Sequence, residues 1–422
     1  MNLPSAGSPV SADKTVVGRK RWLPASILLL GPGLMVMLAD TDAGSVITAA
    51  QSGASYGYRL LLPQLILIPI LYIVQEITVR LGIITGKGHG ELIREHYGKG
   101  WAWLSGVTLL AACVGALITE FAGIAGVGQL VGLPPWLTVT AVALALALLC
   151  VTGGYRRVEV VGVTLGLLEL LFIPAAILAH PQGGAMAYGL AHSISTHPAY
   201  LQLVAANVGA VIMPWMVFYQ QGAVLDKGLR AKDLRIGRID TAVGSVVTQI
   251  IMAAVVVATA ATVGRAHPGQ ALQTVGQIAD ALVPALGRTG ANLLFGLGML
   301  GASTVAALVV AVAGSRGLGE VLGWRVSLND SRSHARAFYL VCVAALLGSA
   351  IAVVLAPSLV NLSVDVQVMN AVLLPIVLGF LLLLEHRALP VQHRQHGLSL
   401  ITTWTLTGIV VVFGLYTAVT VL

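Results

Sequence analysis

The sequence has few charged side chains. They make up 10% of the 422 residues, whereas 57% of the residues are hydrophobic. This balance excludes an ordinary soluble globular protein, and the mean hydropathy of +0.89 is typical of a chain that crosses a membrane many times. The three cysteines lie in apolar runs, which argues against a disulfide framework and against a zinc cluster. We therefore expect an all-α polytopic membrane protein without a cofactor.

The sequence also lacks a polar stretch long enough to form a soluble domain. We find neither a nucleotide-binding loop nor a Ser-His-Asp grouping, and the Gly-rich segment "GKGHGE" at 86–91 lacks the Walker spacing, so an enzyme is not expected. Residues 1–23 are polar and basic without an apolar core, which is typical of a cytosolic tail rather than a signal peptide. Residues 24–422 then form a single transmembrane domain.

Apolar runs of sufficient length for a membrane span occur eleven times. With the N-terminus in the cytoplasm, all but three of the 24 Lys and Arg residues fall on the cytoplasmic side, the exceptions being Arg59, Arg265 and Arg288. The net charge of +7 thus reflects the orientation of the chain in the membrane and predicts no nucleic-acid partner. We also expect no obligate protein partner. The expected location is the cell (inner) membrane. The expected spans are 26–51, 59–80, 101–130, 134–152, 156–179, 201–225, 238–264, 289–315, 336–356, 361–385 and 399–421.

Two of the expected spans contain helix-breaking residues. The first carries "GPG" at 31–33 and "DTDAGS" at 40–45, and the sixth carries Gly209 and Pro214. These two spans are five apart, so each begins one half of a repeat of five plus five spans. Matching interruptions in two halves indicate an inverted-repeat transporter with its site near the membrane midplane. We place the first repeat at 24–180, the second at 200–386 and an extra span at 399–421.

The first interruption contains two carboxylates, Asp40 and Asp42, and each costs about 2.5–3.5 kcal/mol at the centre of a bilayer. They would point to nearly opposite faces of a regular helix, so only an unwound segment brings both near one site. A site formed by Asp42, Ser45, the Ala210 carbonyl and the Met213 sulfur suits a dehydrated cation. The thioether favours manganese, iron and later transition metals over the harder magnesium and calcium ions.

Four segments occur in this order along the chain: "GPGLMVMLADTDAGS", "VRLGIITGKGHGELIREHYG", "GGYRRVEVV" and "GAVIMPWMVFY". Together they resemble the Nramp family of divalent-metal transporters, over residues 26 to 385. The resemblance implies a leucine-transporter-like fold. It also implies manganese or iron(II) as the transported substrate, often with proton cotransport.

The resemblance assigns roles to individual residues. The family's first-span Asp-Pro-Gly-Asn falls on residues 42–45, so its metal-binding Asp is Asp42 and Ser45 replaces its Asn. The sixth-span Ala-x-x-Met pair falls on Ala210 and Met213. Trp215 stands where the family has a histidine tied to conformational change and proton handling.

Further departures concern the third and tenth spans. Of the family's third-span Asp-x-x-Glu pair only Glu120 remains, because Leu117 replaces the Asp. In the tenth span Leu373 stands where the family often has a metal-facing Gln, and we expect Asn370, one turn earlier, to substitute for it.

Asp40 and Glu76 are additions relative to the family. Asp40 is a second metal ligand, a hydrogen-bond acceptor behind the ligands, or a replacement proton acceptor. Glu120, Glu76 and Trp215 are expected to handle protons or to support the ligands. For the intramembrane acids Glu120 and Glu169 the alternative is a structural, hydrogen-bonded or ion-paired role.

All ten histidines fall in expected loops or at span ends, although histidine is the side chain that titrates near neutral pH. We therefore expect proton coupling to be weak, absent or rerouted through carboxylates.

Two alternatives remain open at this stage. Magnesium is one, because loss of the Asn and gain of a carboxylate suit a larger, more hydrated site, although Met213 argues against it. An amino-acid-like organic solute on the same fold is the other; there Asp42 would repel the substrate carboxylate unless an amine or sodium accompanied it. A pore is less compatible with paired broken helices.

Overall fold

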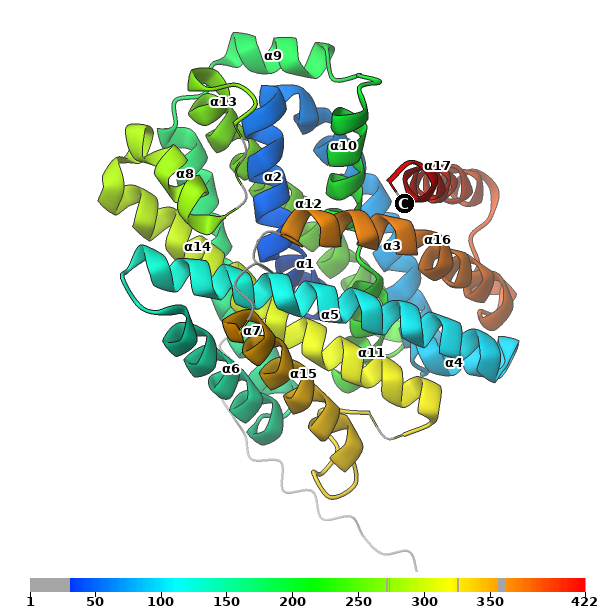
Figure 1. The fold of residues 1–422 in the computed structure, drawn as a ribbon. Helices are drawn as coiled ribbons and strands as arrows, with labels where there is room; N and C mark the ends of the chain where they lie inside the picture. Colours follow the sequence, from blue (N-terminus) through cyan, green and yellow to red (C-terminus); the bar gives the residue numbers. More distant parts are fainter. Residues whose placement is uncertain (1–30, 271, 273, 325, 356–361, 422) are drawn as a thin grey trace, which may run out of the picture.

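The computed structural model describes residues 31–270, 272, 274–324, 326–355 and 362–421, and every regular element within these ranges is helical. The expected tail at 1–23 and the start of the first span lie outside the described residues. The α-helices (Figure 1) are α1 (Pro32–Asp40), α2 (Ala43–Tyr56), α3 (Leu61–Thr85), α4 (His89–Tyr97), α5 (Lys99–Leu130), α6 (Pro135–Thr152), α7 (Tyr155–Gly166), α8 (Phe172–Leu178), α9 (Gly183–Ala191), α10 (Pro198–Val211), α11 (Pro214–Asp226), α12 (Leu234–Ala261), α13 (Val263–Ala266), α14 (Val275–Leu322), α15 (Arg336–Leu355), α16 (Ser363–Ala388) and α17 (Gly397–Val421).

Within the described residues, ten helical segments are long and apolar enough to cross a membrane. One of them, Ala43–Thr85, has 43 residues and holds both α2 and α3, which is too long for one crossing. Counting α2 and α3 separately, with α1 completing the first crossing, agrees with the eleven expected spans. The eighth expected span, 289–315, is the central part of α14, which starts at Val275 and changes direction at Gly287 (φ 69°, ψ 161°).

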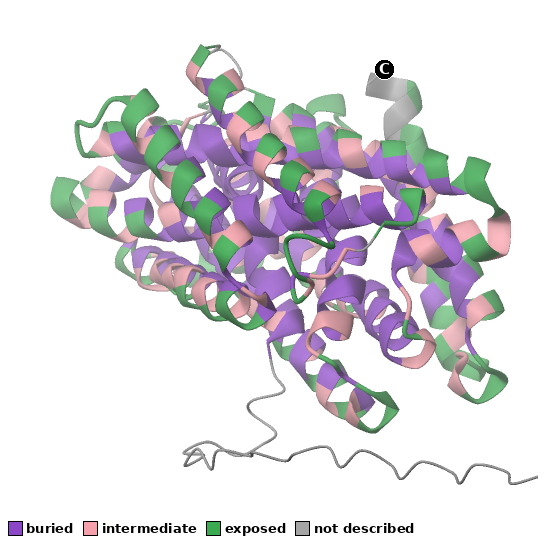
Figure 2. Cartoon of the chain, turned by 90° about the horizontal axis from the view of Figure 1, so that it is seen from below, coloured by how far each residue is buried: buried purple, intermediate pink, exposed green. Residues whose placement is uncertain are grey.

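The helices separate into a buried centre and a periphery. The most apolar windows of α10–α11 and α14 are 83% and 78% buried, whereas those of α6 and α17 are 28% and 22% buried. Figure 2 shows the buried residues running through the middle of the bundle and the exposed ones on its outer helices. Leucine, isoleucine, valine and tryptophan side chains are exposed on the peripheral helices, as expected for a surface in contact with lipid.

Both expected interruptions are present. The first span stops at Asp40 and resumes at Ala43, and Asp42 has extended backbone (φ −72°, ψ 173°). The sixth stops at Val211 and resumes at Pro214, with Met213 extended (φ −101°, ψ 142°). Proline fixes its own φ and disfavours a helical conformation for the preceding residue, which explains the second break.

The broken spans lie at the centre of the bundle, enclosed by α12, α14 and α16 (Figure 1). Helix α12 packs against α1 and α2, and α16 packs against α2 and α10. Helix α5, which is the third span, lies along α14 and also packs against α2. The two unwound segments are thereby held side by side in a water-poor interior, where exposed backbone is tolerated only because protein surrounds it.

Candidate metal-transport site

Asp42 is the carboxylate that the fold orients most tightly. It caps the N-terminus of α2: its Oδ1 accepts the backbone N–H of Ser45 at 2.6 Å and the Gln367 side-chain amide at 3.3 Å. Its other oxygen, Oδ2, has no hydrogen-bond partner in the described part of the chain, although Asp42 is completely buried. A buried carboxylate oxygen without a partner is costly, so this atom is the natural position for a cation.

Ser45 joins the two broken spans. Its hydroxyl donates a hydrogen bond to the Ala210 carbonyl at 2.9 Å, one residue before α10 ends. A hydroxyl oxygen that donates one bond keeps lone pairs for another partner, and a carbonyl oxygen has two lone pairs. The structure thus brings together Asp42, Ser45 and Ala210, and their oxygens remain able to bind a cation.

Gln367 is the site residue that the sequence reasoning missed. It lies on α16, and it is Gln367, not Asn370, that contacts Asp42. Asn370 stands behind it, because its side-chain nitrogen donates to the Gln367 Oε1 at 2.9 Å. Both side chains are completely buried. Two amides three residues apart on one face of an otherwise apolar span were the available signal.

Glycines make this contact possible. A Cβ on Gly44 would lie 2.4 Å from the Gln367 side-chain nitrogen, and a Cβ on Gly209 would lie 1.9 Å from the Gln367 backbone oxygen. Only residues without a side chain allow α2 and α10 to approach α16 this closely.

The second break places Met213 directly before α11, in extended backbone and with no exposed surface. Trp215, two residues later, is also fully buried, and its indole nitrogen has no partner among the described residues. An indole N–H is a donor only, so Trp215 cannot accept a proton as a histidine would.

Three further acids surround the first break. Glu120 on α5 accepts the Ala43 backbone N–H at 3.1 Å, which holds the start of α2. Asp40 ends α1 with its Oδ1 unpaired, and Glu169 lies in the 3-10 segment η3 (Leu167–Leu171) with both oxygens unpaired within the described chain. In the described ranges, no group of three or more His, Cys, Asp or Glu side chains is positioned to hold a metal ion.

Glu76 lies in a different part of the molecule. It forms ion pairs with Arg80 at 3.1 Å and Arg238 at 2.7 Å, and Arg80 also pairs with Glu385 at 3.2 Å. The expectation that Glu76 supports the site has no counterpart in its contacts, which tie α3 to α12, while Arg80 ties α3 to α16.

Asp240 on α12 was also missed by the sequence reasoning. Its carboxylate accepts the backbone N–H groups of Gly31, Gly33 and Leu34 at 2.7–3.1 Å, which are the unpaired donors at the start of α1. A lone acid in an apolar span and a helix beginning with Gly-Pro-Gly were the available signals.

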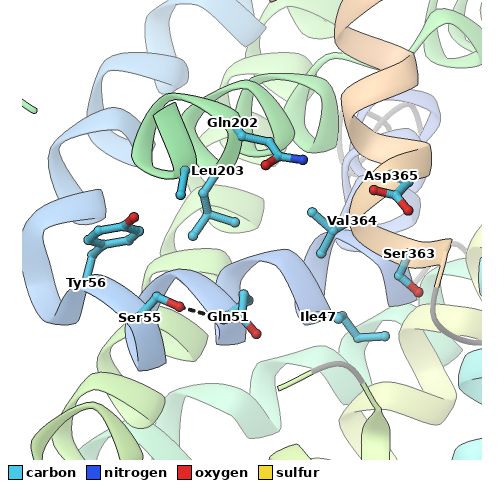
Figure 3. A pocket seen from close by; sticks show the side chains of 10 residues that line it. Ile47, Gln51, Ser55, Tyr56, Gln202, Leu203, Ser363, Val364 and Asp365 are labelled. Carbon is cyan, nitrogen blue, oxygen red and sulfur yellow. Dashed lines mark hydrogen bonds between the residues drawn. The ribbon is translucent and has the colours of Figure 1, made fainter. Parts of the chain in front are cut away.

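A cavity of about 290 Å³ lies between α2, α10 and α16 on the side of the breaks opposite α1 and α11 (Figure 3). Gln51, Tyr56, Gln202 and Asp365 are among its lining residues. Asp365 precedes Gln367 by two residues on α16, so the cavity lies near the level of the site along this helix.

Two buried ion pairs lie on the side of the breaks that carries α1 and α11. Lys227 pairs with Glu159 at 2.7 Å beside the start of α1, and Arg316 pairs with Asp226 at the end of α11. The side chains of these four residues are at most 12% exposed. Buried pairs of this kind are costly to break, so they hold the halves α1 and α11 in place.

His89, the first residue of α4, is completely buried although it lies outside the spans. Its ring contacts the Phe218 ring at a centroid distance of 4.9 Å. Burial lowers the pKa of His89 to about 4, so its imidazole is neutral at physiological pH and binds no proton there.

Comparison with known proteins identifies the family of the chain. The model of the family "Natural resistance-associated macrophage protein-like" (Nramp) matches residues 33–420. The divalent metal cation transporter MntH of Brucella suis is 27% identical over 68% of this chain and 66% of its own length. MntH of Pectobacterium carotovorum is 29% identical over 73% of this chain and 75% of its own length.

Solved structures establish the fold. The manganese transporter of Eremococcus coleocola superposes with a TM-score of 0.78 at 20% identity, covering 96% of this chain and 89% of that one. MhsT, solved with L-phenylalanine, superposes with a TM-score of 0.62 at 17% identity, over 95% and 99% of the two chains. The expected all-α, leucine-transporter-like membrane fold is therefore confirmed, and the matched relatives are transporters rather than enzymes. With the match covering nearly the whole sequence, this multi-pass membrane protein belongs to the Nramp family of divalent-metal transporters.

Proposed function

We propose that this protein moves a divalent metal cation, manganese or iron(II), across the cell membrane, with its N-terminus in the cytoplasm. The observation that carries this proposal is the unpaired Oδ2 of Asp42, buried where the two broken spans meet. The Ser45 hydroxyl and the Ala210 carbonyl add neutral oxygens beside it, and the Gln367 amide holds the other oxygen of Asp42. One carboxylate with several neutral ligands suits a divalent ion that sheds part of its water.

Alternating access is the mechanism that fits this arrangement. We infer that the cavity lined by Asp365 and Gln202 provides access from one side, and that the Lys227–Glu159 and Arg316–Asp226 pairs close the other. Release to that second side then requires these pairs to separate and the halves α1 and α11 to move.

Magnesium is the second candidate. The hydrogen bonds bring together oxygens of Asp42, Ser45 and the Ala210 carbonyl, which hard cations prefer, and Asp40 adds an acid nearby. Manganese is favoured by Met213, whose position matches the family's thioether, and by the names of the matched relatives. The organic-solute alternative has less support, because buried acids surround the site.

Isothermal titration calorimetry of the purified protein separates the two ions. We expect manganese and cadmium to bind. Met213→Ala should lower the affinity for both ions by about tenfold, a loss typical of perturbing a metal site, and should change the affinity for magnesium or calcium little. Met252→Ala on α12 is the matched control, because Met252 is equally buried and lies outside the two breaks. Binding of magnesium without manganese or cadmium would establish the second candidate, and no binding of any divalent ion would refute the proposal.

We further propose that proton coupling is weak, absent or rerouted through carboxylates. Trp215 cannot accept a proton, His89 stays neutral, and the other nine histidines lie outside the membrane-spanning core. In proteoliposomes loaded with a pH-sensitive dye, we expect metal uptake with little accompanying acidification. Strong metal-driven acidification that disappears in Glu120→Gln would contradict the uncoupled form of this proposal and assign the proton pathway to Glu120.

A further inference from the structure

A larger cavity, of about 800 Å³, lies beside the Glu76 ion pairs rather than beside the metal site. Its walls are the second half of α3, the start of α12, the linker between α16 and α17, and the first turns of α17. Nothing in the transport mechanism uses this cavity.

Its charge is positive. Arg80, Arg238 and Arg394 line it, against a single carboxylate, that of Glu76. The glutamate is already bound by Arg80 and Arg238, and Arg80 is further engaged by Glu385. A net excess of guanidinium groups therefore faces the cavity, which predicts an anionic ligand.

Two of the arginines keep donors available. Arg238 uses its Nε to reach Glu76 at 2.7 Å, and Arg394 uses its Nε to reach the Leu389 carbonyl at 2.8 Å. Within the described chain, no hydrogen bond involves the terminal nitrogens of either group. A guanidinium carries five N–H donors in a fixed fork, and the two terminal nitrogens match the oxygens of a phosphate.

The same cavity has an apolar wall. Ile73, Leu234 and Leu398 line it, and Leu398 is 79% exposed at the start of the peripheral helix α17. Guanidinium groups beside exposed aliphatic side chains are typical of the level at which lipid headgroups meet acyl chains. A soluble anion would have no use for this wall.

We propose that the cavity binds the phosphate headgroup of an anionic membrane lipid between Arg238 and Arg394, with its acyl chains along Ile73 and Leu398. The lipid bridges the start of α12 and the α16–α17 linker, so it stabilises the attachment of α17 to the bundle. This inference is independent of which metal the protein transports.

Native mass spectrometry and thermal denaturation of the delipidated full-length protein test the proposal, with phosphatidylglycerol, phosphatidylcholine and inorganic phosphate as probes. We expect phosphatidylglycerol alone to bind and to raise the melting temperature. In the double variant Arg238→Gln, Arg394→Gln its affinity should fall about 30-fold, since each arginine near an anionic surface contributes about fivefold. Arg156→Gln, Arg157→Gln is the matched control, because these arginines are exposed at the start of α7 and outside the cavity.

Replacement of both arginines by lysine retains the charge and should restore most of the binding. If the double Gln variant does not fold, Arg394→Gln alone serves, because Arg394 takes no part in the Glu76 ion pairs. The proposal is overturned if phosphatidylcholine binds equally, if the Gln variants retain phosphatidylglycerol, or if inorganic phosphate alone reproduces the stabilisation.

Discussion

Asp42→Asn is expected to abolish metal transport while leaving the fold intact. Asparagine keeps the size of the side chain and remains a good N-cap, so the hydrogen bond to the Ser45 N–H that starts α2 survives. What disappears is the negative charge of the carboxylate that caps α2 where the broken spans meet. We expect manganese affinity to fall by about 100-fold or more, beyond the 10–100-fold typical of losing a group behind the ligands.

Two variants make this result specific. Asp280→Asn removes the same charge from an exposed residue that pairs with Arg288, and it should bind manganese normally. Asp42→Ala removes the helix cap as well, so its free energy of unfolding should be lower than that of Asp42→Asn by about 1 kcal/mol. Calorimetry measures the manganese affinity of each variant, and thermal denaturation measures its stability. Unchanged manganese affinity in Asp42→Asn would show that Asp42 is a structural cap only.

Gly209→Ala is expected to be the most damaging small substitution for the fold around the site. The added methyl would lie 1.9 Å from the Gln367 backbone oxygen and 2.7 Å from the Ala371 nitrogen. Both atoms belong to the backbone of α16, so the clash is relieved only when α10 and α16 separate. We expect the free energy of unfolding to fall by about 3 kcal/mol or more, which is the upper end of the effects of overpacking. Manganese affinity should fall too, because Gln367 moves away from Asp42.

Gly379→Ala provides the control on α16, the helix against which Gly209 packs. A Cβ at Gly379 meets no atom within 4 Å, and alanine stabilises a helix interior over glycine by about 0.5–1 kcal/mol. The melting temperature should thus fall in Gly209→Ala and stay level or rise in Gly379→Ala. Equal melting temperatures for the two variants would show that the close contact of α10 with α16 is not required.

The sequence predicted the parts of the site that depend on local chemistry. Asp42 followed by Ala-Gly-Ser predicts a helix start, and Met213 before Pro214 predicts a helix that cannot continue. Both breaks were therefore expected from neighbouring residues alone, and the structure confirms them. The apolar runs predicted the eleven crossings for the same reason, since each run satisfies its own backbone hydrogen bonds within the bilayer.

The partners of these residues depend on contacts across the chain. Gln367 contacts Asp42 although 325 residues separate them in the sequence. Gln367 reaches Asp42, and Asn370 does not, because of the way α16 is rotated against α2 and α10. Glu76 was expected to support the site as an intramembrane acid; the position of Arg238, 162 residues away, makes it part of an ion pair. Asp240 caps α1 across more than 200 residues.

The sequence by itself determined the number of spans, the two unwound segments and the place of Asp42 at the first of them, because helix formation and helix breaking are decided within a few residues. Only the tertiary structure decided which amide reaches Asp42, which acids are paired, and where the cavity between α2, α10 and α16 lies. Those outcomes depend on how closely two helices approach each other. Gly44 on α2 and Gly209 on α10 have no side chain, which allows both helices to lie against Gln367 of α16.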